Sequence, residues 1–201
     1  MIKNVIFDFG QVLVHFVPKN MVAKVISDKN DAGIVEQIMF DRCYWDKLDA
    51  GTVSDDEVVA DARTRLPERL WADAEKIYRD WIYNCPETEG MREILHTLKE
   101  KGIHLFLLSN ISKTFAEHEE ANPILSEFEG KVFSSLCGMT KPNPEIFRYV
   151  CRIFSLLPEE TVFVDDSEKN IKGAESVGIK GYLFDGDVEK LSAFLSRITS
   201  R

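Results

Sequence analysis

The residue most suggestive of chemistry is Asp8, the one charged group in the apolar run VIFDFGQVLV at positions 5–14. Polar residues also follow three later apolar runs: Ser109 and Asn110, Lys141, and Asp165 and Asp166. Each alone has an ordinary interpretation, because an acid or amide at a strand end often caps a turn or a helix. If the runs are parallel strands, however, their ends lie on one edge of a sheet and the polar residues converge.

Two carboxylates that meet at one edge repel each other unless a positive charge lies between them. Mg²⁺ suits this place, because it prefers oxygen ligands and is commonly held by one or two carboxylates together with substrate phosphate oxygens. Lys141 and the Ser109 hydroxyl would then donate hydrogen bonds to a phosphate. The residue types therefore predict a site for phosphoryl chemistry, where positioning and charge neutralisation supply most of the catalysis.

The elements that must position these residues follow from the apolar pattern. Short apolar runs predict strands at 5–7, 103–108, 132–133, 161–164 and 181–184. Helical spacing predicts helices at 89–101, 114–120, 144–154, 168–177 and 188–198. Strands that alternate with helices and read as continuous apolar runs indicate a parallel sheet covered on both faces. The fold class predicted is therefore a doubly wound α/β core.

The interval after the first strand contains no second strand signal. Helical spacing of apolar residues instead predicts four helices, at 21–26, 34–40, 55–66 and 70–82. We interpret residues 16–85 as a four-helix cap inserted into a core made of residues 1–15 and 86–201. The alternative is that these helices merely complete the packing of the core. The insertion leaves from the carboxyl end of the first strand, where open α/β sheets bind ligands, and this favours the cap.

The composition excludes several classes of partner. Acidic residues outnumber basic ones 34 to 25 and no run of Lys and Arg forms a basic face, so we expect no binding to nucleic acid or anionic membranes. No apolar run approaches the roughly 20 residues that span a bilayer, and the N-terminus lacks the apolar segment of a signal peptide. Four dispersed cysteines without a C-x-x-C pair predict buried thiols in a reducing compartment. We therefore expect a cytoplasmic protein.

Four short motifs together resemble the haloacid dehalogenase superfamily over nearly the whole chain. They are the apolar strand ending in Asp8, LLSN at 107–110, KPNPEIF at 141–147 and VFVDDSEKN at 162–170. Each motif alone is weak, but their order and the helical insertion between the first two match the superfamily. The insertion resembles the small helical cap of its first cap class, and FDFGQVLV is similar to a variant first motif within a phosphatase branch of that class.

The resemblance implies a mechanism in which Asp8 attacks phosphorus to form an aspartyl-phosphate that water then hydrolyses. Mg²⁺ would be bound by the carboxylates of Asp8 and Asp166 and by the backbone carbonyl of Gly10. Ser109 would hydrogen-bond the phosphoryl oxygens, and Lys141 would bridge Asp8 and the phosphate. The substrate would thus be a small phosphorylated metabolite.

The resemblance also assigns supporting residues. Asp165 belongs to the candidate metal group, and with Asn170 it would orient metal-bound water. The candidate substrate-binding residues are Phe9, Gly10, Ser109, Asn110, Lys141 and, from the cap, Trp45. Trp45 lies in the segment MFDRCYWDKLDAG at 39–51, whose aromatic and charged groups suit a sugar. The alternative is that Trp45 and Tyr44 are core residues between cap helices.

The chain departs from the superfamily pattern at Gly10. Typical phosphatases of this kind have an Asp two residues after the nucleophile, where it protonates the leaving oxygen and then activates water. Without that acid we expect a preference for phosphates with stable leaving groups, with hexose 1-phosphates as the leading class. His15 or a cap residue would have to replace the acid if no such preference exists.

Two other functions remain open at this point. A 2-haloacid dehalogenase also uses a strand-end Asp nucleophile and lacks the acid two residues on, but it needs no metal. A noncatalytic phosphate-binding protein of the same fold would have little use for a carboxylate nucleophile beside its anion. The paired acids Asp165 and Asp166 favour the metal-dependent phosphatase.

Overall fold

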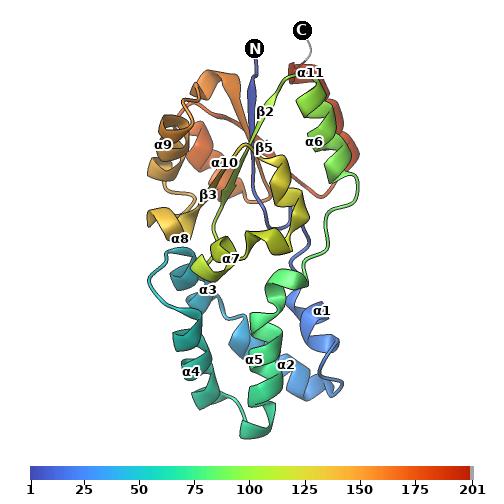
Figure 1. The fold of residues 1–201 in the computed structure, drawn as a ribbon, viewed down its shortest axis with the longest axis vertical. Helices are drawn as coiled ribbons and strands as arrows, with labels where there is room; N and C mark the ends of the chain where they lie inside the picture. Colours follow the sequence, from blue (N-terminus) through green and yellow to red (C-terminus); the bar gives the residue numbers. More distant parts are fainter. Residues whose placement is uncertain (200–201) are drawn as a thin grey trace.

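The core of the protein is a five-stranded parallel sheet, seen in the upper half of Figure 1. The computed structural model describes residues 1–199. The strands are β1 (Asn4–Phe7), β2 (His104–Ser109), β3 (Gly130–Phe133), β4 (Thr161–Asp165) and β5 (Lys180–Leu183). Their order in the sheet is β3-β2-β1-β4-β5. The chain thus winds outward from β1 in one direction and then returns to its other side, which confirms the doubly wound fold.

Helices cover both faces of this sheet, and each face has its own apolar core. One face is covered by α6 (Met91–Glu100) and α11 (Val188–Thr199), the other by α9 (Pro144–Ile153) and α10 (Glu168–Glu175). Successive strand residues point to opposite faces. Phe7 accordingly packs in the cluster that contains Leu95 and Leu191, whereas Ile6 packs with Phe147 and Ala174. Burial on both faces explains why the strands read as unbroken apolar runs.

A second group of helices occupies the lower half of Figure 1. These are α1 (Pro18–Ala23), α2 (Lys29–Met39), α3 (Arg42–Asp49), α4 (Asp55–Arg65) and α5 (Trp71–Arg79), with 3₁₀ turns at Glu68–Leu70 and Trp81–Tyr83. The sequence analysis predicted four of these helices and missed α3. Only Tyr44 and Leu48 of α3 are buried, so its apolar pattern is weak. Its N-cap residue, Asp41, is of a type that favours helix starts. In the structure the Asp41 carboxylate accepts a hydrogen bond from the backbone N–H of Cys43.

Short elements lie between the sheet and the lower helices or connect the strands. They are α7 (Lys113–Glu117), α8 (Ser134–Cys137) and the 3₁₀ turns Glu119–Ala121, Pro123–Glu127 and Pro158–Glu160. The helix predicted at 114–120 corresponds to α7, which ends earlier, at Glu117. Helix α8 was not predicted. Both α7 and α8 lie at the junction between the two halves of the molecule (Figure 1).

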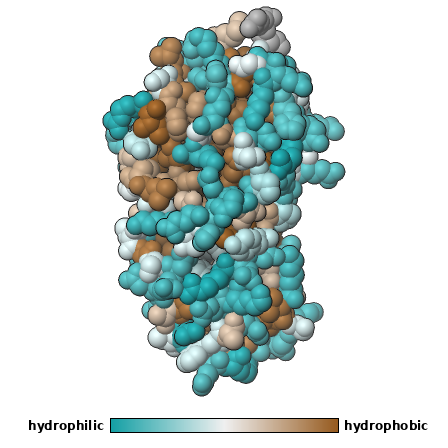
Figure 2. Space-filling model, in the orientation of Figure 1, coloured by the Kyte–Doolittle hydropathy of each residue, from teal (hydrophilic) through white to brown (hydrophobic). Residues whose placement is uncertain are grey.

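The visible surface is mainly hydrophilic, with apolar residues in small groups among charged ones (Figure 2). Within residues 1–199, no helix combines the length and the hydropathy that crossing a bilayer requires. The expectation that all four cysteines are buried is wrong for Cys43, which is exposed, while Cys85 is buried. Cys43 is exposed because it lies on the solvent side of the short helix α3 that the sequence analysis missed.

Candidate active site

Parallel strand register brings the predicted site residues to one edge of the sheet. Phe7, directly before Asp8, pairs with Leu107 in β2 and with Val164 in β4. Ser109 and Asp165 end those two strands, so they lie beside Asp8 at the carboxyl edge. This convergence was predicted from the strand ends alone.

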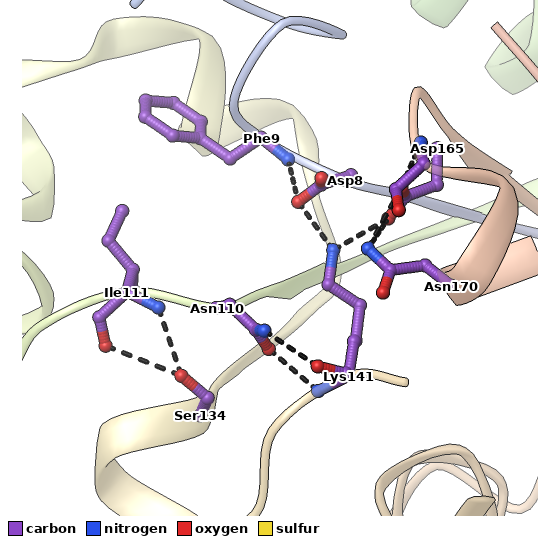
Figure 3. A network of polar contacts seen from close by, with 9 residues as sticks. Asp8, Phe9, Asn110, Ile111, Ser134, Lys141, Asp165 and Asn170 are labelled. Atoms are coloured by element: carbon purple, nitrogen blue, oxygen red, sulfur yellow. Dashed lines mark hydrogen bonds and ion pairs between the residues drawn. The ribbon is translucent and has the colours of Figure 1, made fainter. Parts of the chain in front are cut away.

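Lys141 lies at the centre of the polar cluster (Figure 3). Its buried Nζ is 2.7 Å from Oδ1 of Asp8 and 2.7 Å from Oδ2 of Asp165. Burial lowers the pKa of Lys141, but the two carboxylates more than offset that effect and hold the pKa above its ordinary value. Lys141 is therefore a charged, immobile ammonium between two acids.

Asn110 holds the backbone of Lys141 in this position. Its Oδ1 accepts a hydrogen bond of 2.8 Å from the Lys141 N–H, and its Nδ2 donates one of 3.0 Å to the Lys141 carbonyl (Figure 3). The side chain was predicted to bind substrate. Both of its polar atoms link the loop after β2 to the loop that carries Lys141, and Asn110 also lines the cavity.

The two neighbouring acids at the end of β4 have different surroundings. Asp165 is fully buried, and besides Lys141 it accepts hydrogen bonds from the Ser167 N–H at 2.8 Å and from the Asn170 amide at 3.0 and 3.1 Å. Asp166 is exposed and lines a cavity. Burial and the nearby Asp165 charge raise the pKa of Asp166. Asp165 thus orients Lys141, while Asp166 is available to a ligand.

The donor set suits a hard divalent cation. One carboxylate oxygen from each of Asp8, Asp165 and Asp166 lies within 4.8 Å of the others. Three acids surround a single ammonium here, so ionisation of all three would leave a net negative charge that a divalent cation would offset. The Gly10 carbonyl also lines this region and accepts no hydrogen bond within the described part of the chain. Carboxylate and carbonyl oxygens are the ligands that Mg²⁺ prefers.

Asp8 is oriented by two donors on the same oxygen. Its Oδ1 accepts a hydrogen bond of 2.7 Å from the Phe9 N–H in addition to the Lys141 contact, whereas Oδ2 has no hydrogen-bond partner among residues 1–199. Burial raises the pKa of Asp8 to about 8, with Lys141 opposing the shift and Asp165 reinforcing it. The cluster leaves Oδ2 as the free oxygen of the carboxylate.

Gly10 leaves open space at the position where the resemblance leads us to expect a carboxylate. A Cβ added to it would meet no atom within 4 Å. The backbone does not require glycine either, because the positive φ of this loop, 59°, belongs to Gln11. The consequence of Gly10 is therefore chemical: the position offers no proton donor.

A cavity of about 750 Å³ lies between the sheet edge and the lower helices. The core contributes Asp8, Phe9, Gly10, Ser109, Asn110, Lys141 and Asp166, among others, and the lower helices contribute Phe16, Phe40, Arg42, Trp45, Asp46, Asp49 and Trp81. All predicted substrate-binding residues thus line the cavity. Arg42, Asp46 and Asp49 were not singled out, because their direction depends on helix α3.

Aromatic residues form one wall of this cavity. The ring of Trp45 lies 5.1 Å from that of Phe16 and 5.3 Å from that of Trp81, and its buried indole N–H has no partner among the described residues. Tyr44 is not part of the lining, since its hydroxyl contacts Asp61 and Arg65. The two neighbours therefore face different sides of α3.

His15 is exposed, and it is not among the residues that line the cavity. The sequence analysis considered it as a replacement acid. Its position beyond the first loop, with its backbone N–H bonded to the Pro86 carbonyl at 2.8 Å, places it outside the site.

The end of α3 is attached to the core at α8. The Ser134 hydroxyl donates a hydrogen bond of 2.6 Å to the Asp49 carbonyl and accepts one of 2.9 Å from the Ile111 N–H. Gly51 follows with a φ of +68°, and a Cβ there would lie 2.5 Å from the Ser135 carbonyl oxygen. Both the left-handed backbone and the close approach require glycine at this junction.

We expect Gly51→Ala to lower the free energy of unfolding by about 1–2 kcal/mol or more, from the left-handed backbone alone. Gly33→Ala is the matched control, because Gly33 is exposed inside α2 and a Cβ there meets nothing within 4 Å. It should raise the free energy of unfolding by about 0.5–1 kcal/mol. Urea denaturation of the two variants tests this, and equal effects would contradict the tight junction.

Comparison with known proteins agrees with this geometry. The chain is 29% identical to D-ribitol-5-phosphate phosphatase of Bacteroides thetaiotaomicron over 193 residues, which cover 90% of this chain and 91% of that protein. A crystal structure of a haloacid dehalogenase family enzyme from the same organism, in complex with magnesium and inorganic phosphate, matches with a TM-score of 0.70. That match is 25% identical and covers 95% of this chain and 99% of the other.

A dehalogenase shares the fold. L-2-haloacid dehalogenase from Xanthobacter autotrophicus matches with a TM-score of 0.65 and 17% identity, covering 90% of this chain and 76% of that one. This likeness concerns the fold alone.

The sequence model of the haloacid dehalogenase-like hydrolases matches residues 2–178. With the strand-end Asp8, the buried lysine and the doubly wound sheet in place, the chain belongs to the haloacid dehalogenase-like hydrolase family.

Proposed function

We propose that the protein is a magnesium-dependent phosphatase of small phosphorylated metabolites. The observation that carries this proposal is the arrangement of Asp8, with Oδ1 held by Lys141 and the Phe9 N–H and Oδ2 free beside the cavity. A carboxylate oriented in this way is placed for nucleophilic attack. The phosphatase and magnesium–phosphate relatives support the same reaction.

Three residues of this chain have different roles in the proposed phosphoryl transfer. Oδ2 of Asp8 attacks phosphorus and the bond to the leaving oxygen breaks. The Ser109 hydroxyl, which lines the cavity and has no partner among residues 1–199, donates to a phosphoryl oxygen, and the Lys141 ammonium offsets its charge. Such fixed donors stabilise the charge that develops in the transition state.

Mg²⁺ would be held by Asp8, Asp166 and the carbonyl of Gly10, with Asp165 orienting the group through Lys141 and Asn170. The ion would supply positive charge that neutralises phosphate oxygens and favours ionised Asp8. The helices of residues 16–85 would act as the cap that closes over the substrate.

The cavity lining suits a sugar or polyol phosphate. Trp45 and Phe16 offer apolar ring faces, while Arg42, Asp46 and Gln11 offer charged or amide groups for hydroxyls. The sequence points to hexose 1-phosphates, whereas the relative named above acts on ribitol 5-phosphate. A panel that contains glucose 1-phosphate, glucose 6-phosphate and ribitol 5-phosphate would identify the class.

The dehalogenase alternative receives less support. A reaction that needs no metal gives no reason for three acids within 4.8 Å around one lysine. The noncatalytic alternative leaves the free Oδ2 of Asp8 unexplained, because a carboxylate beside a bound anion weakens binding.

We expect Asp166→Ala to lose about 10²-fold or more in kcat/KM, because removing a metal-binding carboxylate removes several kcal/mol of charge stabilisation. Excess EDTA should abolish wild-type activity, and added Mg²⁺ should restore it. Glu168→Ala is the control, since Glu168 is a nearby exposed acid paired with Lys172 and does not line the cavity. Phosphate release with each protein is the measurement, and full activity in EDTA would refute the magnesium mechanism.

A further inference from the structure

We propose that Asp49 is the general acid and base of the reaction, in place of the carboxylate that is absent at position 10. This inference rests on the proposed phosphatase function and names a further catalytic residue for it. It is carried by the position of Asp49 at the end of α3, where its side chain lines the cavity opposite the sheet edge.

The Asp49 carboxylate has no other task in the fold. It makes no hydrogen bond or ion pair within residues 1–199, although it is half-buried. The other acids of the cavity differ: Asp8 is held by Lys141, Asp166 lies in the proposed metal group, and Asp46 is exposed one turn earlier in α3 with Arg42 as its partner. Outside the proposed metal group, Asp49 is the acid of residues 1–199 that lines this cavity without a hydrogen-bond or ion-pair partner.

The surroundings of Asp49 suit proton transfer near neutral pH. Burial raises its pKa to about 7, while the positive charges of Arg42 and Lys141 oppose the shift and the negative charge of Asp46 reinforces it. The cavity also exposes Asp8, Asp166 and Lys169 to its interior. These are the charged groups around it. A general acid works best when its pKa is close to the working pH.

The backbone of Asp49 is fixed relative to the phosphate-binding loop. Ser134 is the positioning residue: its hydroxyl donates to the Asp49 carbonyl at 2.6 Å and accepts from the Ile111 N–H at 2.9 Å. Ile111 comes two residues after Ser109, the proposed phosphate donor. A cap residue is thus tied to the loop that would hold the phosphoryl group.

Asp49 alone can donate and accept the protons that the two steps of the reaction require. As Asp8 bonds to phosphorus, the leaving oxygen takes the proton of the Asp49 carboxyl and departs as an alcohol, leaving Asp49 as a carboxylate. Asp49 then takes a proton from water, whose oxygen bonds to phosphorus while the bond to Asp8 breaks. Inorganic phosphate leaves, Asp8 is a carboxylate again, and Asp49 is protonated again.

This assignment changes the expected substrate range. An enzyme without an acid would favour stable leaving groups, but an enzyme with Asp49 also turns over phosphates of primary alcohols. The steep leaving-group preference expected from Gly10 should therefore appear only when Asp49 is replaced.

The test is kcat/KM with saturating Mg²⁺ for aryl phosphates of graded leaving-group pKa and for a primary alkyl phosphate. Asp49→Asn should lose about 10²–10⁴-fold with the alkyl phosphate and far less with p-nitrophenyl phosphate, so that its rates fall steeply with leaving-group pKa. Asp73→Asn, at an exposed acid of α5 that does not line the cavity, should keep the shallow wild-type dependence. Gly10→Asp in the Asp49→Asn protein should restore part of the alkyl phosphate rate, because a Cβ fits there.

Equal losses across the series, or an unchanged dependence, would overturn the role of Asp49 while leaving the phosphatase function intact. A wild type without activity on any phosphate would overturn the proposed function as well. For the alkyl phosphate, the wild-type rate should fall as pH rises through about 7, because Asp49 loses its proton, and Asp49→Asn should lack this fall.

Protein stability provides a readout that does not depend on activity. A carboxyl whose folded-state pKa is raised from 3.8 to about 7 favours folding at low pH, and that contribution is lost as pH rises to about 7. The free energy of unfolding of the wild type should therefore decline relative to Asp49→Asn between about pH 4 and 7. A constant difference would show that folding does not raise the pKa of Asp49 and would overturn the inference.

Discussion

Asp8→Asn is expected to lose at least about 10⁴-fold in kcat, because loss of a covalent nucleophile leaves only the binding and charge stabilisation of the site. The amide has nearly the same shape as the carboxylate but is a poor nucleophile. The fold should persist, since the Phe9 N–H and Lys141 can still donate to the amide oxygen. Burial already raises the pKa of Asp8, so a neutral side chain is accommodated there.

The measurement is phosphate release from p-nitrophenyl phosphate, with circular dichroism to confirm the fold. Asp185→Asn is the control, because Asp185 is an exposed acid paired with Lys190 and lies outside the cavity. The wild type should also yield a phosphorylated Asp8 when it is quenched in acid during turnover. Retention of more than a few per cent of activity by Asp8→Asn would rule out the covalent mechanism.

Lys141→Met is expected to have the second large effect, on both stability and activity. It leaves the buried carboxylates of Asp8 and Asp165 without the ammonium that lies 2.7 Å from each. Breaking such a buried pair costs about 3–5 kcal/mol, because the remaining charges are not solvated. Loss of a donor to the transferring phosphoryl group should also lower kcat about 10²–10³-fold.

The stability loss of Lys141→Met should depend on pH with a defined sign. Lys141 lowers the pKa of Asp8, so its removal raises that pKa further, and the folded state then binds protons more tightly than the unfolded chain. The deficit in the free energy of unfolding should therefore shrink as pH falls towards about 8, where Asp8 becomes protonated in both proteins, and it should change little below about pH 7. Adding Asp165→Asn should recover part of it, because one buried charge is removed.

Lys172→Met provides the control for this prediction. Lys172 is exposed in α10 and pairs with Glu168 four residues earlier, so its loss should cost less than about 0.5 kcal/mol. Urea denaturation at several pH values measures both variants. Similar costs for Lys141→Met and Lys172→Met would contradict a buried ion-pair cluster.

The elements of the sheet and its covering helices can be predicted because they depend on local apolar patterns in the sequence. Apolar runs of strand length and helical spacing were sufficient to locate all five strands and the four helices that cover the sheet. Polar residues directly after those strands marked the site, because parallel strands end at the same edge. Asp8, Ser109 and Asp166, which the strand ends predict to meet at one edge, line a common cavity.

The orientation of individual side chains could not be read in the same way. Asp165 and Asp166 are neighbours in sequence, yet one is fully buried against Lys141 and the other faces the cavity. Asn110 is predicted to bind substrate, and the structure adds that its amide holds the Lys141 backbone. These differences depend on partners that lie 24 to 31 residues away in the sequence, which local patterns do not contain.

Helix α3 shows most clearly what the tertiary structure decides. The sequence by itself determined the sheet, its strand ends and the polar residues that meet there, because strand burial and parallel register follow from local apolar runs. It did not determine that the short segment Arg42–Asp49 forms a helix whose last residue, Asp49, lines the cavity. That position depends on Ser134 and on the left-handed turn at Gly51, contacts between segments about 85 residues apart that form only when the two halves of the molecule pack together.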